Sequence, residues 1–286
     1  MRYRRVDYVE EGRMVGTLPG VVREDEFISG YSAGFGGVDF LRESERPDIV
    51  FRLVERTVEE LRYLGIKRVR ILAKPFHYSG SEAYLHLALL RHGFAIEEAN
   101  INFYFELTRY GNPNGYLHSL RHAPKRQLLR ALAERSEWHE LDDVGDWTRP
   151  YEILQESRAR HGATLSLTLE YIRQLRSFFA ERIRMYELSH DGIPVAASLV
   201  YSVTRRHAMV MYWGNSQRHD RAATESDFAA MNLVAYRTVE TALALGFETV
   251  DLGPGSTSEW INYGNCRFKT SIGALPNFRY TMTKSL

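Results

Sequence analysis

The sequence predicts an α/β protein of two tandem units, each a mixed twisted sheet flanked by helices, with the first unit truncated at its N-terminus. Three observations support this fold class. Two helix–glycine–strand segments, around Gly65 and Gly246, match each other. Three predicted strands precede each of these segments in the same order. A chain of 286 residues with 44% apolar side chains is also long enough to bury two cores of ordinary size.

Each of the two glycines ends an amphipathic helix and precedes a short apolar strand. Apolar residues recur at three- and four-residue spacing over residues 49–64, and less regularly over residues 228–245. Glycine is favoured just past a helix end because that position usually adopts a left-handed conformation. A capping box formed by Thr224 and Asp227 predicts the start of the second helix.

The flanking elements extend the repeat in both directions. Glu11-Gly12 and Asp191-Gly192 predict the tight turns between the first two strands of each set. The predicted strands of the two sets are 5–10, 14–23 and 27–35, and 182–189, 193–204 and 207–213. After the matched segments, each unit is expected to continue into a further helix and strand, at 81–91 and 100–107, and at 259–268 and 277–282.

The region between the copies predicts the domain organisation. A helix is expected over about 116–135 after the breaker Gly111-Asn112-Pro113-Asn114-Gly115. A strand at 138–141 and helices at 147–160 and 166–180 then give the second unit a β-α-α start that the first unit lacks. The expected domains are 1–110 for the truncated unit, 111–135 for a basic linker helix and 136–286 for the complete unit.

Composition excludes several classes of function. The 37 basic and 36 acidic side chains leave a net charge of +1, which gives no global field for nucleic acid. A single cysteine, Cys266, excludes an intrachain disulfide and a cysteine-cluster zinc site. Because no apolar run is long enough for a membrane helix and no signal peptide pattern follows Met1, we expect a cytoplasmic protein without membrane insertion.

Four short motifs carry a resemblance to a known family. They are Gly34-Phe35-Gly36-Gly37, Pro124-Lys125-Arg126, Asp251-Leu252-Gly253 and Arg267-Phe268-Lys269-x3-Gly273-Ala274. With the element order β-α-α-β-β-β-α-β-α-β in the second half, the chain resembles the GNAT-type acyltransferase fold. Two such units joined by a basic helix resemble the Fem-like aminoacyltransferases (FemAB/FemX type) that build bacterial peptidoglycan bridges. The resemblance implies amide formation between an activated acyl or aminoacyl donor and an amine, in the second unit.

The sequence leaves the identity of the acyl donor open. The pyrophosphate signature of typical acetyl-CoA enzymes, Gln/Arg-x-x-Gly-x-Gly/Ala, is missing after both fourth strands. No tightly bound cofactor is expected, and acyl-CoA or aminoacyl-tRNA is the possible co-substrate. One alternative function is acyl-CoA-dependent N-acetylation of a small amine or sugar amine. Another is a catalytically inactive binding or scaffold protein of the same fold.

The resemblance implies two catalytic residues. Lys269 matches the family lysine at the acyl-transfer site, where it would stabilise an oxyanion or hold a phosphate; otherwise it is a solvated surface lysine. Tyr263 would protonate the leaving group, unless it only packs. Arg267 is a possible ligand for the donor or a plain surface charge, and Cys266 is a possible nucleophile or a packed residue.

Basic residues elsewhere predict contacts with an anionic substrate. Asn215, Arg218, His219 and Arg221 precede the second long helix, whose N-terminus would favour a donor phosphate. Arg126 and Arg130 share a face of the linker helix and are candidates for contacts with tRNA or with a nucleotide-linked or small-molecule acceptor. Both groups are equally compatible with solvated surface. The histidines show no metal-ligand spacing, so no metal is expected, and the oligomeric state stays open.

Overall fold

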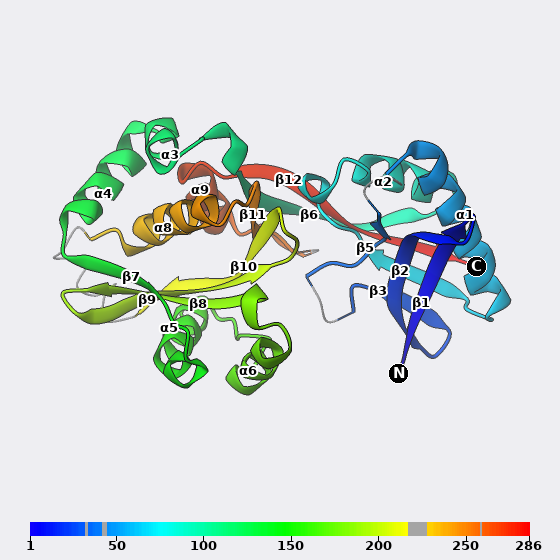
Figure 1. The fold of residues 1–286 in the computed structure, drawn as a ribbon, viewed down its shortest axis with the longest axis horizontal. Coiled ribbons are helices and arrows are strands. Elements are labelled where there is room, and N and C mark those ends of the chain that lie inside the picture. Colours follow the sequence, from blue (N-terminus) through cyan, green and yellow to red (C-terminus); the bar gives the residue numbers. More distant parts are fainter. Residues whose placement is uncertain (32–33, 42–44, 217–227, 258) are drawn as a thin grey trace. The chain divides into compact units, whose positions relative to one another are not determined.

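The structure is a computed structural model that describes residues 1–31, 34–41, 45–216, 228–257 and 259–286. The chain forms two compact units (Figure 1). Unit 1 comprises residues 1–102, 254–262 and 277–286, and unit 2 comprises residues 103–253 and 263–276. Both the predicted mixed α/β class and the tandem arrangement are confirmed. The division differs from the predicted domain boundaries because the last strand, expected in the second unit, joins the sheet of the first.

Unit 1 contains a sheet with two helices. Its strands and helices are β1 (Arg2–Glu10), β2 (Arg13–Arg23), β3 (Glu26–Ser29), β4 (Asp39–Phe40), α1 (Pro47–Tyr63), β5 (Arg68–Leu72) and α2 (Glu82–Arg91), with parts of β6 (Ala95–Glu106) and β12 (Leu275–Ser285). The strand order in this unit is β1-β2-β3-β5-β12-β6, with β4 paired to β2.

Unit 2 contains the larger set of elements. They are α3 (Pro113–Ser119), α4 (His122–Ala133), β7 (Ser136–Glu140), α5 (Thr148–Ala159), α6 (Leu169–Phe178), β8 (Ile183–His190), β9 (Ile193–Ser202), β10 (His207–Asn215), α8 (Ala230–Ala244), β11 (Thr249–Pro254) and α9 (Tyr263–Ser271). With the end of β6 that belongs to it, the strand order is β6-β11-β10-β9-β8-β7.

The predicted repeat is visible in the strand pairing. In unit 1, β1, β2 and β3 are antiparallel neighbours and β3 pairs with β5 in parallel. In unit 2, β8, β9 and β10 are antiparallel neighbours and β10 pairs with β11 in parallel. Gly65 and Gly246 both have φ +76°, each just past the end of its helix. The two units therefore share one β-β-β-α-β frame.

The two sheets differ in how their faces are covered. In unit 1, α1 and α2 pack on one face, over a core that includes Phe27, Leu61 and Val69. On the alternate positions of β5, Arg68 and Arg70 form ion pairs with acidic residues of β3 and β6. This face is polar because unit 1 has no counterpart of α5 and α6 among its described residues.

Unit 2 has helices on both faces of its sheet. Figure 1 shows α5 and α6 on one face and α8 on the other, with α3 and α4 next to α8. Trp147, Ile153 and Ile172 belong to the core on the α5–α6 face, and all three are fully buried. The β-α-α start that the sequence predicted for this unit is β7-α5-α6.

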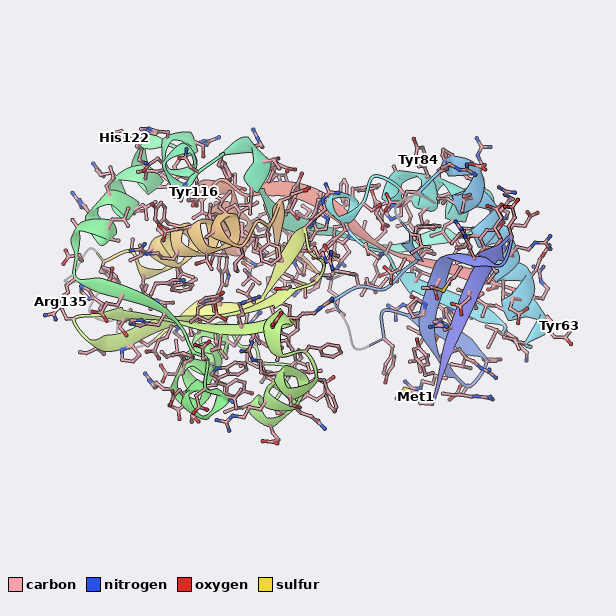
Figure 2. The ribbon with its side chains drawn as sticks, viewed as in Figure 1. Met1, Tyr63, Tyr84, Tyr116, His122 and Arg135 are labelled. Carbon is pink, nitrogen blue, oxygen red and sulfur yellow. The ribbon has the colours of Figure 1, made fainter. Side chains whose placement is uncertain are left out.

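The linker departs from the prediction of one continuous helix. Leu120 has extended ψ of 144° between α3 and α4, so the chain breaks there. Pro124 explains the break, because its ring would clash with the carbonyl of Leu120 in a continuous helix and it has no N–H to donate to that carbonyl. In the first turn of α4, the same proline is tolerated. Figure 2 labels His122, the first residue of α4, and Arg135, which lies between the end of α4 and β7.

Two other predicted boundaries shift. The third strand was expected over 27–35, but β3 ends at Ser29, because Gly30 has φ +91° and the backbone of Gly36 packs closely against Ser29 and Gly30. Helix α8 begins at Ala230, and the predicted capping box at 224–227 lies outside the described residues.

Candidate active site

The candidate site lies in unit 2, where the parallel strands β10 and β11 separate. They pair at only three positions, the last of which joins Met209 to Asp251. Immediately afterwards the register of β10 against β9 shifts between Val210 and Tyr212, so Met211 is a bulge residue. A bulge bends its strand and redirects the peptide groups next to it. β10 therefore leaves β11 at a defined point, and the carboxyl end of β11 is open toward α9.

Lys269 on α9 occupies this open end of β11. Its side chain is only 3% exposed, which excludes the alternative of a solvated surface lysine. The Nζ atom donates hydrogen bonds to the carbonyl oxygens of Leu252, at 2.8 Å, and Gly253, at 2.9 Å. It also lies 5.5 Å from the centre of the Phe103 ring. Carbonyl dipoles and an aromatic face are both groups that attract an ammonium group.

The end of β11 is shaped by the predicted Asp251-Leu252-Gly253 motif. The Gly253 N–H donates to Asp251 Oδ1 at 2.7 Å, and Gly253 has φ +72°, a backbone conformation that favours glycine. The turn exposes the carbonyls of Leu252 and Gly253 on the side where Lys269 binds them. This motif therefore positions the two carbonyls that bind Lys269.

The linker segment fixes the helix that carries the lysine. The hydroxyl of Tyr116 on α3, labelled in Figure 2, donates to the carbonyl of Ile272 at 2.8 Å. The hydroxyl of Tyr110 donates to the carbonyl of Gly273 at 3.1 Å. Burial raises the pKa of both tyrosines, so both hydroxyls stay protonated as donors. They satisfy carbonyls at the C-terminal end of α9, where helices lack internal partners.

The end of β10 forms the opposite side of the site. Trp213 contacts Phe268 of α9 edge to face, with ring centres 6.1 Å apart. Gly214 is required by packing, because a Cβ atom there would lie 2.4 Å from Ser157 Cβ on α5. The side chain of Asn215, a predicted donor ligand, accepts a hydrogen bond from Arg160 at 2.9 Å, and its carbonyl accepts another at 2.6 Å.

The structure places the other predicted residues in different surroundings. Tyr263 is the first residue of α9 and is 68% exposed, so it does not serve as a core residue. Arg267 is exposed and Cys266 is partly buried on the same helix. Arg126 and Arg130 are exposed on α4. Arg218, His219 and Arg221 lie outside the described residues.

Two parts of the site were missed by the sequence interpretation. Arg160 was not singled out, although it lies at the end of a predicted helix; its contact with Asn215 joins residues far apart in the chain. The bulge at Met211 also gives no local signal, because the strand keeps its apolar pattern through it. The described residues contain no group of three or more metal-ligating side chains.

Unit 2 thus combines a parallel strand pair that opens after a bulge with helices on both faces of its sheet. The family model of the acetyltransferase (GNAT) domain matches residues 119–270, more than half of the chain. The protein belongs to this family, and it is an acyltransferase by family and fold. No curated protein matches the sequence.

Solved structures show the same fold over nearly the whole chain. FemX has a TM-score of 0.74 at 12% identity, covering 99% of this chain and 88% of its own. The C-terminal domain of a putative lysylphosphatidylglycerol synthetase from Agrobacterium fabrum has a TM-score of 0.60 at 14% identity, covering 95% and 82%. L-PGS from Bacillus licheniformis has a TM-score of 0.56 at 10% identity, covering 98% and 83%. The predicted Fem-like resemblance is confirmed at the level of the fold.

Helix length and hydropathy bear on membrane association. Within the part of the chain that the structure describes, each helix is too short or too polar to cross a bilayer.

Proposed function

We propose that this acyltransferase forms an amide bond between an activated acyl or aminoacyl donor and an amine acceptor, at the open end of β10 and β11 in unit 2. The observation that supports it is Lys269, a buried cation fixed by two carbonyls where the parallel strands separate. A fixed positive charge of this kind stabilises the oxyanion that develops when an amine attacks an acyl carbon.

The proposed reaction needs no covalent enzyme intermediate. The neutral amine nitrogen attacks the acyl carbon, the carbonyl oxygen becomes an oxyanion, and the charge of Lys269 stabilises it. When the carbonyl re-forms, the bond to the thiol or hydroxyl leaving group breaks. The leaving group takes up a proton, and the amine nitrogen loses one. Tyr263 is the proposed donor of that proton through its phenolic hydroxyl, and the tyrosinate that results takes up the proton that the amine nitrogen loses.

Acyl-CoA is the donor that family membership supports best, because the matched domain belongs to the acetyltransferases. Aminoacyl-tRNA is the second candidate, supported by the exposed Arg126 and Arg130 of α4. We infer that the acceptor is a small or nucleotide-linked amine.

A donor panel tests the proposal directly. Purified protein is incubated with acetyl-CoA, longer acyl-CoA thioesters or a mixed aminoacyl-tRNA pool, with a set of small and nucleotide-linked amines. Amide products are followed by mass spectrometry and thiol release by absorbance. A true donor should also raise the melting temperature, because ligands that bind only the folded state stabilise it. Absence of both a melting-temperature shift and a product across the panel would contradict the proposed transfer and favour a binding or scaffold role.

A further inference from the structure

The outer edge of β1 in unit 1 is open. β1 is the first strand in the sheet order, and Figure 1 shows it, in dark blue, next to β2. Among the residues that the structure describes, the backbone of residues 2–10 forms hydrogen bonds with β2 alone. An edge strand of this kind presents a row of unpaired N–H and C=O groups to other chains.

The usual features that protect an edge strand are missing from β1. Such strands are commonly very short, contain proline or are bent by a bulge. β1 is nine residues long and contains no proline. Its pairing with β2 has a bulge, but the extra residue, Val15, belongs to β2, so β1 itself is regular. The edge strand of unit 2, β7, has only five residues.

The hairpin turn determines which backbone groups of β1 point outward. Glu11 and Gly12 have φ of 50° and 79°, as in the type I′ turn that joins two strands by two residues. The residues on either side of this turn, Glu10 and Arg13, are paired, so the N–H and C=O groups of Glu10 face β2. Alternate residues of a strand point these groups to opposite edges. The odd-numbered residues of β1 therefore direct theirs to the open edge.

The sequence of β1 is complementary to itself when a second β1 runs antiparallel to it about Val6. In this register Arg5 faces Asp7 of the second copy, and Arg2 faces Glu10 of the second copy. Each pair occurs twice, because a twofold axis relates the two copies. Opposite charges that face each other across two strands stabilise their pairing. The register also joins odd-numbered residues to odd-numbered residues, as the direction of the outward backbone groups requires.

The charges of β1 disfavour the neighbouring registers. Pairing about Arg4, Arg5 or Asp7 would place that residue opposite the same residue of the second copy. Like charges directly opposite each other destabilise a strand pair. The charged residues therefore protect β1 against pairing in these registers and permit pairing about Val6.

Two exposed apolar side chains face each other in the same register. Val6 and Tyr8 pack against the core of unit 1, so Tyr3 and Val9 lie on the other face of β1. Their side chains are 66% and 56% exposed, respectively. Pairing about Val6 places Tyr3 opposite Val9 of the second copy, and an aromatic residue next to a β-branched one is a favourable cross-strand pair. A second copy would thus cover both side chains.

We propose that β1 is the interface for a second copy of this chain, which adds its own β1 antiparallel about Val6 and joins the two unit 1 sheets into one. Outward backbone groups supply the hydrogen bonds, and the Arg5–Asp7 and Arg2–Glu10 pairs select the partner and the register. The candidate active site in unit 2 uses no residue of β1, so this interface is independent of the proposed acyl transfer.

Exchanging charges tests the proposed register. Sedimentation velocity of the full chain, at up to about 1 mM to reveal weak association, should show a concentration-dependent dimer. Asp7→Arg and Arg5→Asp each place like charges opposite each other, so each variant alone should dimerise about 10-fold or more weakly. Both side chains are exposed, so neither change disturbs a core. An equimolar mixture of the two variants restores both opposite-charge pairs and should form a heterodimer.

Amide exchange and a proline variant test the backbone pairing. The amides of Tyr3, Arg5, Asp7 and Val9 should exchange more slowly as protein concentration rises, because they are protected only in the dimer. Arg5→Pro removes one outward N–H and leaves the hydrogen bonds with β2 in place, as proline at an edge allows. It should abolish the dimer without unfolding the chain, as checked by circular dichroism.

Glu137→Arg is the matched control, because it reverses a charge on β7, the edge strand of unit 2. It should leave dimerisation unchanged. The proposal is overturned if the chain stays monomeric over the whole concentration range, or if Asp7→Arg and Arg5→Asp leave the dimer intact. It is also overturned if the mixture of these two variants associates no more tightly than each variant alone.

Discussion

Unit 1 and unit 2 each place a lysine at the carboxyl end of the parallel strand pair, but the groups that accept hydrogen bonds from the two lysines differ. In unit 1, Lys74 donates to the Val38 carbonyl at 2.7 Å and to Asp39 at 2.6 Å, and it lies 3.8 Å from Glu82. In unit 2, Lys269 donates to two peptide carbonyls. Two carboxylates lie beside the lysine of unit 1, whereas the lysine of unit 2 binds the carbonyls at the end of β11. The same frame therefore contains an ion-paired lysine in unit 1 and the proposed catalytic cation in unit 2.

The largest expected effect comes from removing the cation of unit 2. Lys269→Met should lower the rate of acyl transfer by about a hundredfold or more, because an oxyanion donor is lost. It should also lower the free energy of unfolding by about 1–3 kcal/mol, because two buried carbonyls lose their donor. A surface lysine would have left stability unchanged. Steady-state kinetics and urea denaturation measure the two effects.

Lys74→Met is the matched control in unit 1. It should destabilise the protein, because Glu82 loses its partner, and leave the rate of the folded protein unchanged. Equal losses of rate in both variants would contradict the distinction between the two lysines.

The buried carboxyl of unit 1 predicts a dependence of stability on pH. Glu82 is 2% exposed, and burial raises its pKa from 4.5 to about 7, against the opposing effect of Lys74. The folded protein thus holds this proton more tightly than the unfolded chain does. Stability should fall as pH rises from about 4.5 to 7, by up to about 3 kcal/mol. Glu82→Gln should remove that loss and stabilise the protein at pH 8, as measured by denaturant titrations across pH.

His86, one helical turn further along α2, should give the free energy of unfolding the opposite dependence on pH. Burial lowers its pKa from 6.5 to about 4, so the folded protein resists protonating it. Its contribution to stability is lost as pH falls from about 6.5 to 4. His86→Phe keeps the edge contact with Phe76 and should abolish this loss. An unchanged pH profile in both variants would show that neither group titrates with folding.

Packing at the end of β10 predicts a smaller effect on stability. Gly214→Ala would bring a Cβ atom to 2.4 Å from Ser157, so α5 or β10 must shift. The expected cost is about 1–3 kcal/mol of unfolding free energy. Ser157→Gly should recover part of it in a double-mutant cycle. Gly80→Ala in unit 1 is the control, because no atom lies within 4 Å of its new Cβ. Similar losses at the two glycines would refute the close approach.

The smallest expected effect concerns the basic surface of α4. If aminoacyl-tRNA is the donor, replacing Arg126 and Arg130 by Gln should reduce the salt dependence of tRNA binding by roughly one to two units of slope. Arg52 and Arg56 on α1, also four residues apart, are the matched control and should have no effect. Filter binding of a mixed tRNA pool measures the slopes. Absence of saturable binding at low salt would exclude tRNA and leave acyl-CoA.

Local rules predicted the frame of the fold. Gly65 and Gly246 could be identified because a left-handed position after a helix favours glycine wherever the rest of the chain lies. The turns at Glu11-Gly12 and Asp191-Gly192 follow from the same kind of rule, and all four residues have positive φ. The linker break was missed although Pro124 signals it, because the apolar spacing was allowed to outweigh the proline.

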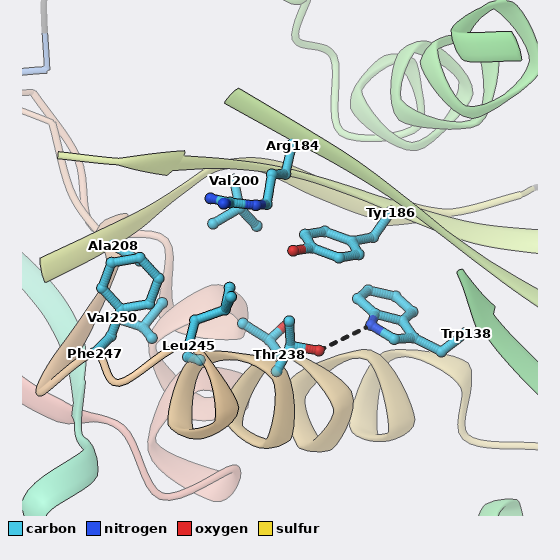
Figure 3. Close-up of a pocket in the computed structure, with 11 residues that line it drawn as sticks. Trp138, Arg184, Tyr186, Val200, Ala208, Thr238, Leu245, Phe247 and Val250 are labelled. Carbon is cyan, nitrogen blue, oxygen red and sulfur yellow. Dashed lines mark hydrogen bonds between the residues drawn. The ribbon is translucent and has the colours of Figure 1, made fainter. Parts of the chain in front are cut away.

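The site was only partly predictable for a physical reason. Lys269 was found through a motif, but its burial depends on carbonyls from β11, and α9 is too short for periodicity to show which face is buried. Arg160 contacts Asn215 across the fold, and no local pattern records that contact. The small pocket lined by Trp138, Tyr186 and Thr238 (Figure 3) brings together residues from separate strands and α8, so no local pattern records it.

Of the elements in this sequence, β12 is synthesised last, yet it lies between β5 and β6 in the sheet of unit 1. The facing edges of β5 and β6 therefore lack their native partner while unit 2 is being made. Unpaired strand edges invite association with other chains. Nascent domains usually complete their folding from the N-terminus onward. Here the order is reversed: unit 1 starts first and finishes last, so a nascent chain stalled before residue 275 would present an open sheet to chaperones.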